Sequence, residues 1–166
     1  VDAADDFVAK GGGLAVLGSG DPWLEGQLQA LATRNPGKVG LRIGYDEALS
    51  HRMFAGGDAV LVPSRFEPCG LTQLYGLRYG TVPVVAATGG LADTVINANP
   101  VAKAAGVSTG IVFQGIDRLG LSCALDHLLQ LFADQKGWTL MQKRGMSQDL
   151  GWGVSSARYA ELYKAL

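Results

Sequence analysis

Short apolar runs alternate with stretches of helical periodicity along this chain. The apolar runs, rich in Val, Ile and Leu, predict five strands at 14–17, 39–43, 59–62, 82–86 and 110–113. The segments between them predict helices at 1–10, 22–35, 46–57, 71–79 and 91–96, and a polar loop or partial helix at 97–109. Continuous apolar strands that alternate with helices are typical of a parallel sheet buried on both faces. The pattern therefore predicts an α/β fold with a doubly wound, Rossmann-like sheet.

Local signals mark several helix ends. Asp21 before Pro22 is typical of an N-cap followed by proline at the first helical position, and Asp46 is a second candidate cap. From position 117 onward we expect helix alone, in segments broken near Gly137 and Gly151. The last segment, 151–166, has one apolar face.

The order of the elements at the start of the chain is unusual. A doubly wound domain normally opens with a strand, whereas this chain opens inside a helix. The pattern favours a fragment that lacks a leading strand and loop. The alternative is that the first helix is native and the sheet has five strands.

Composition excludes several classes of function. The chain has 166 residues, 14 basic against 15 acidic side chains and a net charge of −1, which gives no electrostatic basis for binding nucleic acid or an anionic membrane. No apolar run approaches the roughly 20 residues of a membrane helix. Cys69 and Cys123 form neither a CxxC pair nor a zinc motif, so the cysteines indicate no metal site. We expect no metal and no bound cofactor. These features indicate one soluble, cytoplasmic domain, and a charged fraction of only 17% suggests that part of its surface meets another surface.

Ligands of such sheets bind beyond the carboxyl ends of the strands, which directs attention to the loops there. Glu67 lies just after a buried strand and just before a helix. It either caps that helix or serves as a functional carboxylate that holds hydroxyl groups or opposes positive charge. Tyr45, after the second strand, is either a core residue or a stacking platform for a base, and the pattern alone favours the core.

Two turns on consecutive strand–helix units have the features of anion sites. Thr88-Gly89-Gly90 and the turn after Cys69-Gly70 each precede a helix, whose first N–H groups favour phosphate. Two such turns beside Glu67 suggest a diphosphate next to a group rich in hydroxyls, as in a nucleotide sugar. Cys69 has no histidine near it in sequence, so we interpret it as a small lining residue and not as a nucleophile.

Two longer motifs carry a resemblance to a known family. They are SRFEPCGLTQLY at 64–75 and TGGLADTV at 88–95. With them, the chain resembles the C-terminal domain of bacterial glycogen synthases and plant starch synthases over essentially its whole length. The resemblance implies a GT-B architecture of two Rossmann-like domains, of which residues 1–166 would be most of the domain that binds the donor, ADP-glucose. The helix at 151–166 would pack toward the absent N-terminal domain, which holds the α-1,4-glucan acceptor.

The resemblance also implies roles for individual residues. Glu67 would be the essential acidic residue at the donor glucose. The nucleotide sugar would be bound by Tyr45, stacked on adenine, by the backbone of Cys69, Gly70 and Leu71, by Thr72, and by the turn formed by Thr88, Gly89, Gly90 and Leu91. Related glycosyltransferases have a second glutamate where this chain has Tyr75, so recognition of the ribose by a second carboxylate is not expected.

The activity implied is transfer of glucose, with retention of configuration, to the non-reducing end of an α-1,4-glucan by the full-length enzyme. We expect the fragment alone to be inactive, because it lacks the acceptor half and the cations that the family places before Val1. Two alternatives remain. The chain is the donor domain of another GT-B glycosyltransferase that uses UDP-glucose, or it is a non-catalytic nucleotide-binding module.

Overall fold

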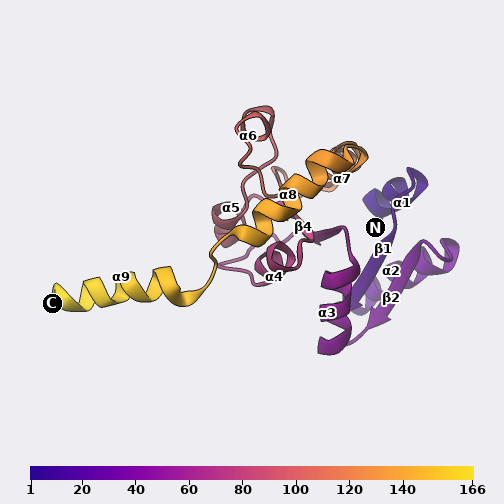
Figure 1. Ribbon diagram of the computed structural model, residues 1–166. Helices are drawn as coiled ribbons and strands as arrows, with labels where there is room; N and C mark the ends of the chain where they lie inside the picture. Colours follow the sequence, from indigo (N-terminus) through magenta and orange to yellow (C-terminus); the bar gives the residue numbers. More distant parts are fainter.

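The predicted alternation of strands and helices is present in the computed structural model, which describes residues 1–166 (Figure 1). The strands are β1 (Leu14–Gly18), β2 (Val39–Ile43), β3 (Ala59–Val62), β4 (Val82–Ala86) and β5 (Ile111–Phe113). The helices of the first half are α1 (Asp2–Ala9), α2 (Pro22–Arg34), α3 (Glu47–Gly56) and α4 (Thr72–Tyr79). Those of the second half are α5 (Gly89–Thr94), α6 (Pro100–Ala104), α7 (Arg118–Ala133), α8 (Gln135–Ser147) and α9 (Trp152–Lys164).

All strand pairs are parallel, as predicted, but the strands form two sheets. β1 pairs with β2, and β4 lies between β3 and β5. No hydrogen-bonded ladder joins β1 to β3. The sequence predicted a single doubly wound sheet, whereas the structure has two separate parallel sheets. The pattern could not predict this separation, because an apolar run indicates a strand but not which strand it pairs with.

Side-chain caps and glycine set the helix ends where the sequence placed them. The Asp21 carboxylate accepts hydrogen bonds from the N–H groups of Trp23 (2.9 Å) and Leu24 (3.2 Å). Asp46 accepts one from Leu49 N–H (2.9 Å). Gly80 ends α4 in the left-handed region, with φ of 78°.

The predicted helix break near Gly137 is present, but it lies slightly earlier in the chain. The helices α7 and α8 separate at Asp134, whose carboxylate accepts a hydrogen bond from Gly137 N–H at 3.0 Å. Gly137 thus lies in the first turn of α8. An N-cap aspartate stabilises the start of the new helix, and this outweighs the modest cost of a glycine inside it.

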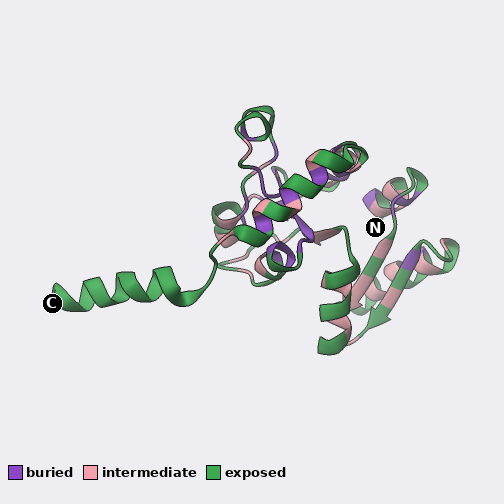
Figure 2. Cartoon of the chain, in the orientation of Figure 1, coloured by how far each residue is buried: buried purple, intermediate pink, exposed green.

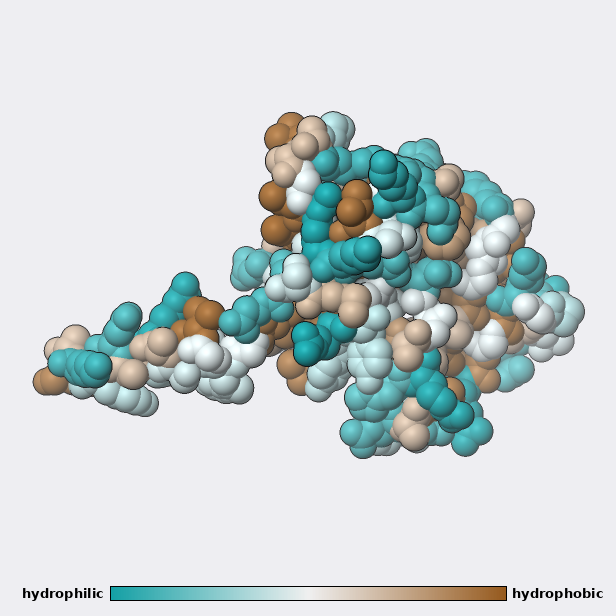
Figure 3. All heavy atoms as spheres, viewed as in Figure 1, coloured by the Kyte–Doolittle hydropathy of each residue, from teal (hydrophilic) through white to brown (hydrophobic).

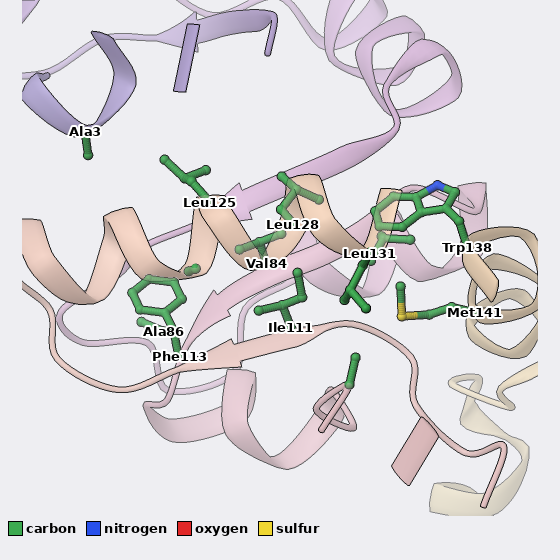
Figure 4. Packing of buried hydrophobic residues seen from close by; sticks show 13 residues of the cluster. Ala3, Val84, Ala86, Ile111, Phe113, Leu125, Leu128, Leu131, Trp138 and Met141 are labelled. Atoms are coloured by element: carbon green, nitrogen blue, oxygen red, sulfur yellow. The ribbon is translucent and has the colours of Figure 1, made fainter. Parts of the chain in front are cut away.

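The main hydrophobic core lies between the β3–β4–β5 sheet and the pair α7–α8 (Figures 2 and 4). Every residue of β4 is buried, and Val84 packs with Ile111 and Leu128 in this core. A smaller core in the other half joins α1, α2 and β2 through Val8, Leu31 and Val39.

The C-terminal helix α9 stands apart from both cores. It has no buried residue and projects from the body of the molecule (Figures 1 and 2). Its surface mixes apolar and polar side chains (Figure 3), and Trp152 at its start is 75% exposed. No helix of the structure combines the length and apolar character that crossing a membrane would require.

Candidate functional site

The two loops that carry most of the predicted site residues lie directly against one another. They follow β3 and β4 and are here called the paired loops: residues 64–71, and residues 88–91, which include the first turn of α5. Gly90 N–H donates a hydrogen bond to the carbonyl oxygen of Glu67 at 3.2 Å. A Cβ atom added to Gly89 would lie 2.1 Å from that same oxygen, and one added to Gly90 would lie 2.3 Å from the carbonyl oxygen of Cys69. Glycine is therefore required at both positions for the two backbones to approach this closely.

Glu67 lies in the first of the paired loops, where its side chain is half-buried and has almost no protein partners. Its only side-chain contact of hydrogen-bonding type is with the Ser64 hydroxyl, at 3.5 Å. The ion pairs of the protein all involve other residues. The N-cap residue of α4 is Leu71, and no side chain caps this helix. The helix-capping alternative for Glu67 is therefore wrong, and the carboxylate is available to a ligand.

Unused hydrogen-bond donors lie beside this carboxylate. The N–H groups of Cys69, Gly70 and Leu71 donate to no acceptor in the protein. They are followed by the first turn of α4, whose N–H groups also lack intrahelical partners. A row of free N–H groups at a helix start favours an anionic or hydroxyl-rich ligand.

The second of the paired loops offers fewer free donors than the sequence suggested. Gly90 N–H is used by Glu67, and Leu91 N–H donates to the carbonyl oxygen of Thr88 at 3.1 Å. Gly89 N–H has no acceptor in the protein, and the Thr88 hydroxyl makes no capping bond. Within this turn, Gly89 N–H and the Thr88 side chain are the groups left for a ligand.

Gln73 is a site residue that the sequence reasoning did not single out. Its side chain is fully buried, and Nε2 donates to the carbonyl oxygens of Cys69 (2.9 Å) and Gly70 (2.8 Å) and to the Thr94 hydroxyl (3.2 Å). The Thr94 hydroxyl in turn bonds the Gly90 carbonyl oxygen. Gln73 therefore ties both paired loops to the body of the domain. A signal was present, since Gln73 lies four positions before Leu77 on the buried face of α4.

Replacement of this amide tests its positioning role. Gln73→Met keeps the volume but removes the amide that donates to the carbonyl oxygens of Cys69 and Gly70. We expect the free energy of unfolding to fall by about 1–3 kcal/mol, as measured by urea denaturation. The matched control is Gln27→Met on the exposed face of α2, which should change stability little. Equal effects of the two substitutions would show that the hydrogen bonds of Gln73 do not hold the loops.

Tyr45 belongs to the other half of the molecule, after β2. Its side chain is 88% exposed, so the interpretation of this tyrosine as a core residue is wrong. Gly44 precedes it with φ of 120° and donates its N–H to the carbonyl oxygen of Gly18 at 3.0 Å. The exposed ring is thus presented from a turn that is anchored to the carboxyl end of β1.

The paired loops form an open surface. A hollow of about 540 Å³ lies beside β5 and α7 and contains none of the predicted site residues. It is lined by His127, among others, and there partial burial, together with the positive charge of Lys103, lowers the pKa of the imidazole. A second hollow of about 310 Å³ is lined in part by Pro63, which directly precedes the first of the paired loops, and by Arg65, which lies within that loop.

No protein-family model matches the chain. The sequence is 61% identical over 161 residues to a glycogen synthase of Cereibacter sphaeroides, covering 97% of this chain and 34% of that protein. It is 59% identical over 166 residues to a glycogen synthase of Novosphingobium aromaticivorans, covering 100% of this chain and 34% of that protein. Among solved structures, it matches the catalytic domain of starch synthase IV from Arabidopsis thaliana bound to ADP and acarbose, with a TM-score of 0.87 and 33% identity over 99% of this chain and 34% of the other. The chain spans about a third of the length of these relatives.

Proposed function

We propose that this chain is the domain that binds the sugar donor. It is homologous to the glycogen synthases over essentially the whole length of this chain, and it has the fold of one Rossmann-like half of a GT-B glycosyltransferase. The donor is ADP-glucose. The full-length protein transfers its glucose, with retention of configuration, to the non-reducing end of an α-1,4-glucan.

A single observation carries this proposal, namely the half-buried carboxylate of Glu67 beside the free N–H groups of Cys69, Gly70 and Leu71. Its one protein partner is the distant Ser64 hydroxyl, at 3.5 Å. A carboxylate without a protein partner is costly to desolvate, and the hydroxyl groups of a sugar supply the missing donors. In the transition state of glucosyl transfer, positive charge develops on the sugar ring. The negative charge of Glu67 opposes it, while the free N–H groups bind the neighbouring phosphate.

The remaining donor contacts follow from the same arrangement. Gly89 N–H and the Thr88 hydroxyl would bind the distal phosphate. Thr72 is exposed on the first turn of α4 and would face the ribose or phosphate. The ring of Tyr45 would stack on adenine, which its high exposure allows. The nucleotide would thus extend from the β1–β2 half of the molecule to the paired loops.

A second domain is needed to complete this site. The paired loops form an open wall, and α9 has an exposed aromatic side formed by Trp152, Tyr159 and Tyr163. We propose that α9 packs toward the acceptor domain, which binds the glucan and closes over the donor. The 166-residue chain alone should therefore show no glucosyl transfer, and turnover by the purified chain would contradict this assignment of roles.

Calorimetric titration of the chain with ADP and with UDP tests the donor assignment. We expect weak, saturable binding of ADP and weaker binding of UDP. Tighter binding of UDP would favour another GT-B glycosyltransferase that uses UDP-glucose. If circular dichroism shows that the chain is folded and neither ADP nor UDP binds to it, this domain does not recognise the nucleotide by itself.

The same titration tests the role of Tyr45. Tyr45→Ala should weaken ADP binding by about 5- to 150-fold, because stacking of a base on an aromatic ring contributes about 1–3 kcal/mol. Tyr45→Phe keeps the ring and should bind ADP as the parent chain does. The matched control is Tyr159→Ala, which removes an exposed tyrosine from α9. An unchanged ADP affinity in Tyr45→Ala would place the base elsewhere.

A further inference from the structure

Helix α3 is held in the molecule mainly by one neighbouring helix. It has no buried residue and contributes to no hydrophobic core. Its packing is directed against α4, which itself packs on the β3–β4–β5 sheet (Figure 1). Because a helix depends on tertiary packing for its stability, the contact between α3 and α4 decides where α3 lies.

Four side chains with rings form this contact. They are His51 and Phe54 of α3 and Tyr75 and Tyr79 of α4, here called the aromatic cluster. The ring centroid of Phe54 lies 5.9 Å from that of each tyrosine, edge-on to Tyr75 and stacked with Tyr79. The ring of His51 lies 6.4 Å from that of Tyr75 and 6.0 Å from that of Tyr79. His51 Nδ1 and the Tyr79 hydroxyl also share a hydrogen bond of 2.9 Å.

The main chain of α3 is attached to the same side of the molecule. The hydroxyl of Thr81, which directly precedes β4, donates a hydrogen bond to the carbonyl oxygen of Phe54. Phe54 is thus fixed through both its ring and its main chain. Ring pairs at these distances attract one another beyond the effect of their buried area. The helix α3 is therefore bound to the part of the molecule that carries α4, although the chain enters it from β2.

Each of these two helices begins at one part of the candidate site. Tyr45 directly precedes Asp46, the N-cap residue of α3. Leu71 ends the first of the paired loops and is the N-cap residue of α4, and its carbonyl oxygen accepts a hydrogen bond from Tyr75 N–H at 2.8 Å. Tyr75 is therefore one turn from the paired loops, and His51 is less than two turns from Tyr45. Contact between the helices thus sets the distance from Tyr45 to the paired loops.

The turn that carries Tyr45 has two attachments. On one side, Gly44 N–H donates to the carbonyl oxygen of Gly18 at 3.0 Å. On the other side, the chain continues directly into α3. The exposed side chain of Tyr45 adds no packing of its own. Movement of α3 would therefore displace the ring of Tyr45 relative to the paired loops.

From these contacts we propose that the aromatic cluster positions the two parts of the nucleotide site. Its rings hold Tyr45 at the distance from the paired loops that the base and the phosphates of one nucleoside diphosphate require. This inference rests on the proposed function, in which Tyr45 stacks on adenine and the paired loops hold the phosphates. A ligand that joins two groups gains affinity only where both groups are engaged at once. Tyr75 and Tyr79 are positioning residues that act through the placement of α3.

Amide hydrogen exchange in the full-length protein tests whether the rings hold α3. Tyr75→Ala removes two of the ring contacts and should speed the exchange of the α3 amides by about 10-fold or more. Tyr75→Phe keeps the ring and should restore the exchange rates of the parent protein. The matched control is Tyr163→Ala, which removes an exposed tyrosine from α9. Unchanged exchange of α3 in Tyr75→Ala would overturn the proposal, because other contacts would then hold this helix.

Titration of the same proteins with ADP, adenosine and pyrophosphate tests the effect on the site. In Tyr75→Ala, and in His51→Ala on the facing helix, we expect ADP to bind at least about 10-fold more weakly, because ADP must engage both parts of the site. Adenosine reaches only Tyr45, and pyrophosphate reaches only the paired loops. Both should therefore bind the variants as they bind the parent protein, and ligand-observed NMR measures these weaker affinities.

The results separate this inference from the function on which it rests. If the parent protein binds ADP and both variants bind it equally well, the positioning role is overturned and the proposed function stands. Equal weakening of all three ligands would also overturn the positioning role, because the damage would then lie within each part of the site. Failure of the folded parent protein to bind ADP would contradict the proposed function and this inference with it.

Discussion

Glu67→Gln in the full-length protein is expected to lower kcat for glucosyl transfer by about 100- to 1,000-fold, with little change in KM for the donor. The glutamine amide is isosteric with the carboxylate and still bonds sugar hydroxyls, so binding of the ground state is preserved. The substitution removes the negative charge that opposes the positive charge of the transition state. Loss of one preorganised electrostatic contact of this kind lowers kcat by roughly 100- to 1,000-fold. Steady-state assay of glucose incorporation from ADP-glucose into glucan measures both constants.

The matched control for this experiment is Glu47→Gln. Glu47 is exposed in the first turn of α3 and makes no side-chain hydrogen bond. Its substitution should leave both kinetic constants unchanged. Transfer by Glu67→Gln at the rate of the control would exclude a catalytic role for the carboxylate and would favour a non-catalytic nucleotide-binding module. A rise in KM alone would make Glu67 a residue for ground-state binding only.

Gly90→Ala is expected to abolish measurable ADP binding and to lower the free energy of unfolding by about 1–3 kcal/mol, or more. The added Cβ would lie 2.3 Å from the Cys69 carbonyl oxygen, which is far inside contact distance and is a rigid backbone atom. The paired loops must separate to admit it. Separation breaks the hydrogen bond from Gly90 to Glu67 and shifts the N–H groups that would hold the phosphate. Calorimetric titration and urea denaturation measure the two effects.

A second glycine provides the control for this substitution. Gly26 lies inside α2 with no atom within 4 Å of an added Cβ. Gly26→Ala should therefore raise the free energy of unfolding by about 0.5–1 kcal/mol, because alanine restricts the unfolded chain, and should leave ADP binding unchanged. If Gly90→Ala binds ADP as well as Gly26→Ala does, the close approach of the paired loops is not needed for the nucleotide.

Local sequence was sufficient to predict the individual elements. The bounds of β3 and β4 are those of their apolar runs, and the caps at Asp21 and Asp46 are where the residue types indicated. These features depend on a few neighbouring residues, through side-chain burial and short-range hydrogen bonds. The position of Glu67 in the loop after β3 was likewise visible in the pattern.

The arrangement of the loops and the pairing of the strands depend on contacts between segments that are distant in the sequence. The sequence could not show that Gly90 lies on the backbone of Cys69, that Gln73 bonds three groups across the site, or that Tyr45 is exposed, because each depends on which loops the fold brings together. Nor could it show that β1 and β3 are separated, since a strand pattern records burial and not the identity of the neighbouring strand. The sequence by itself thus determined the parallel α/β elements and the residues with chemistry to offer. The tertiary structure alone decided which of them face a common ligand surface, because strand pairing and backbone approach are properties of the packed chain.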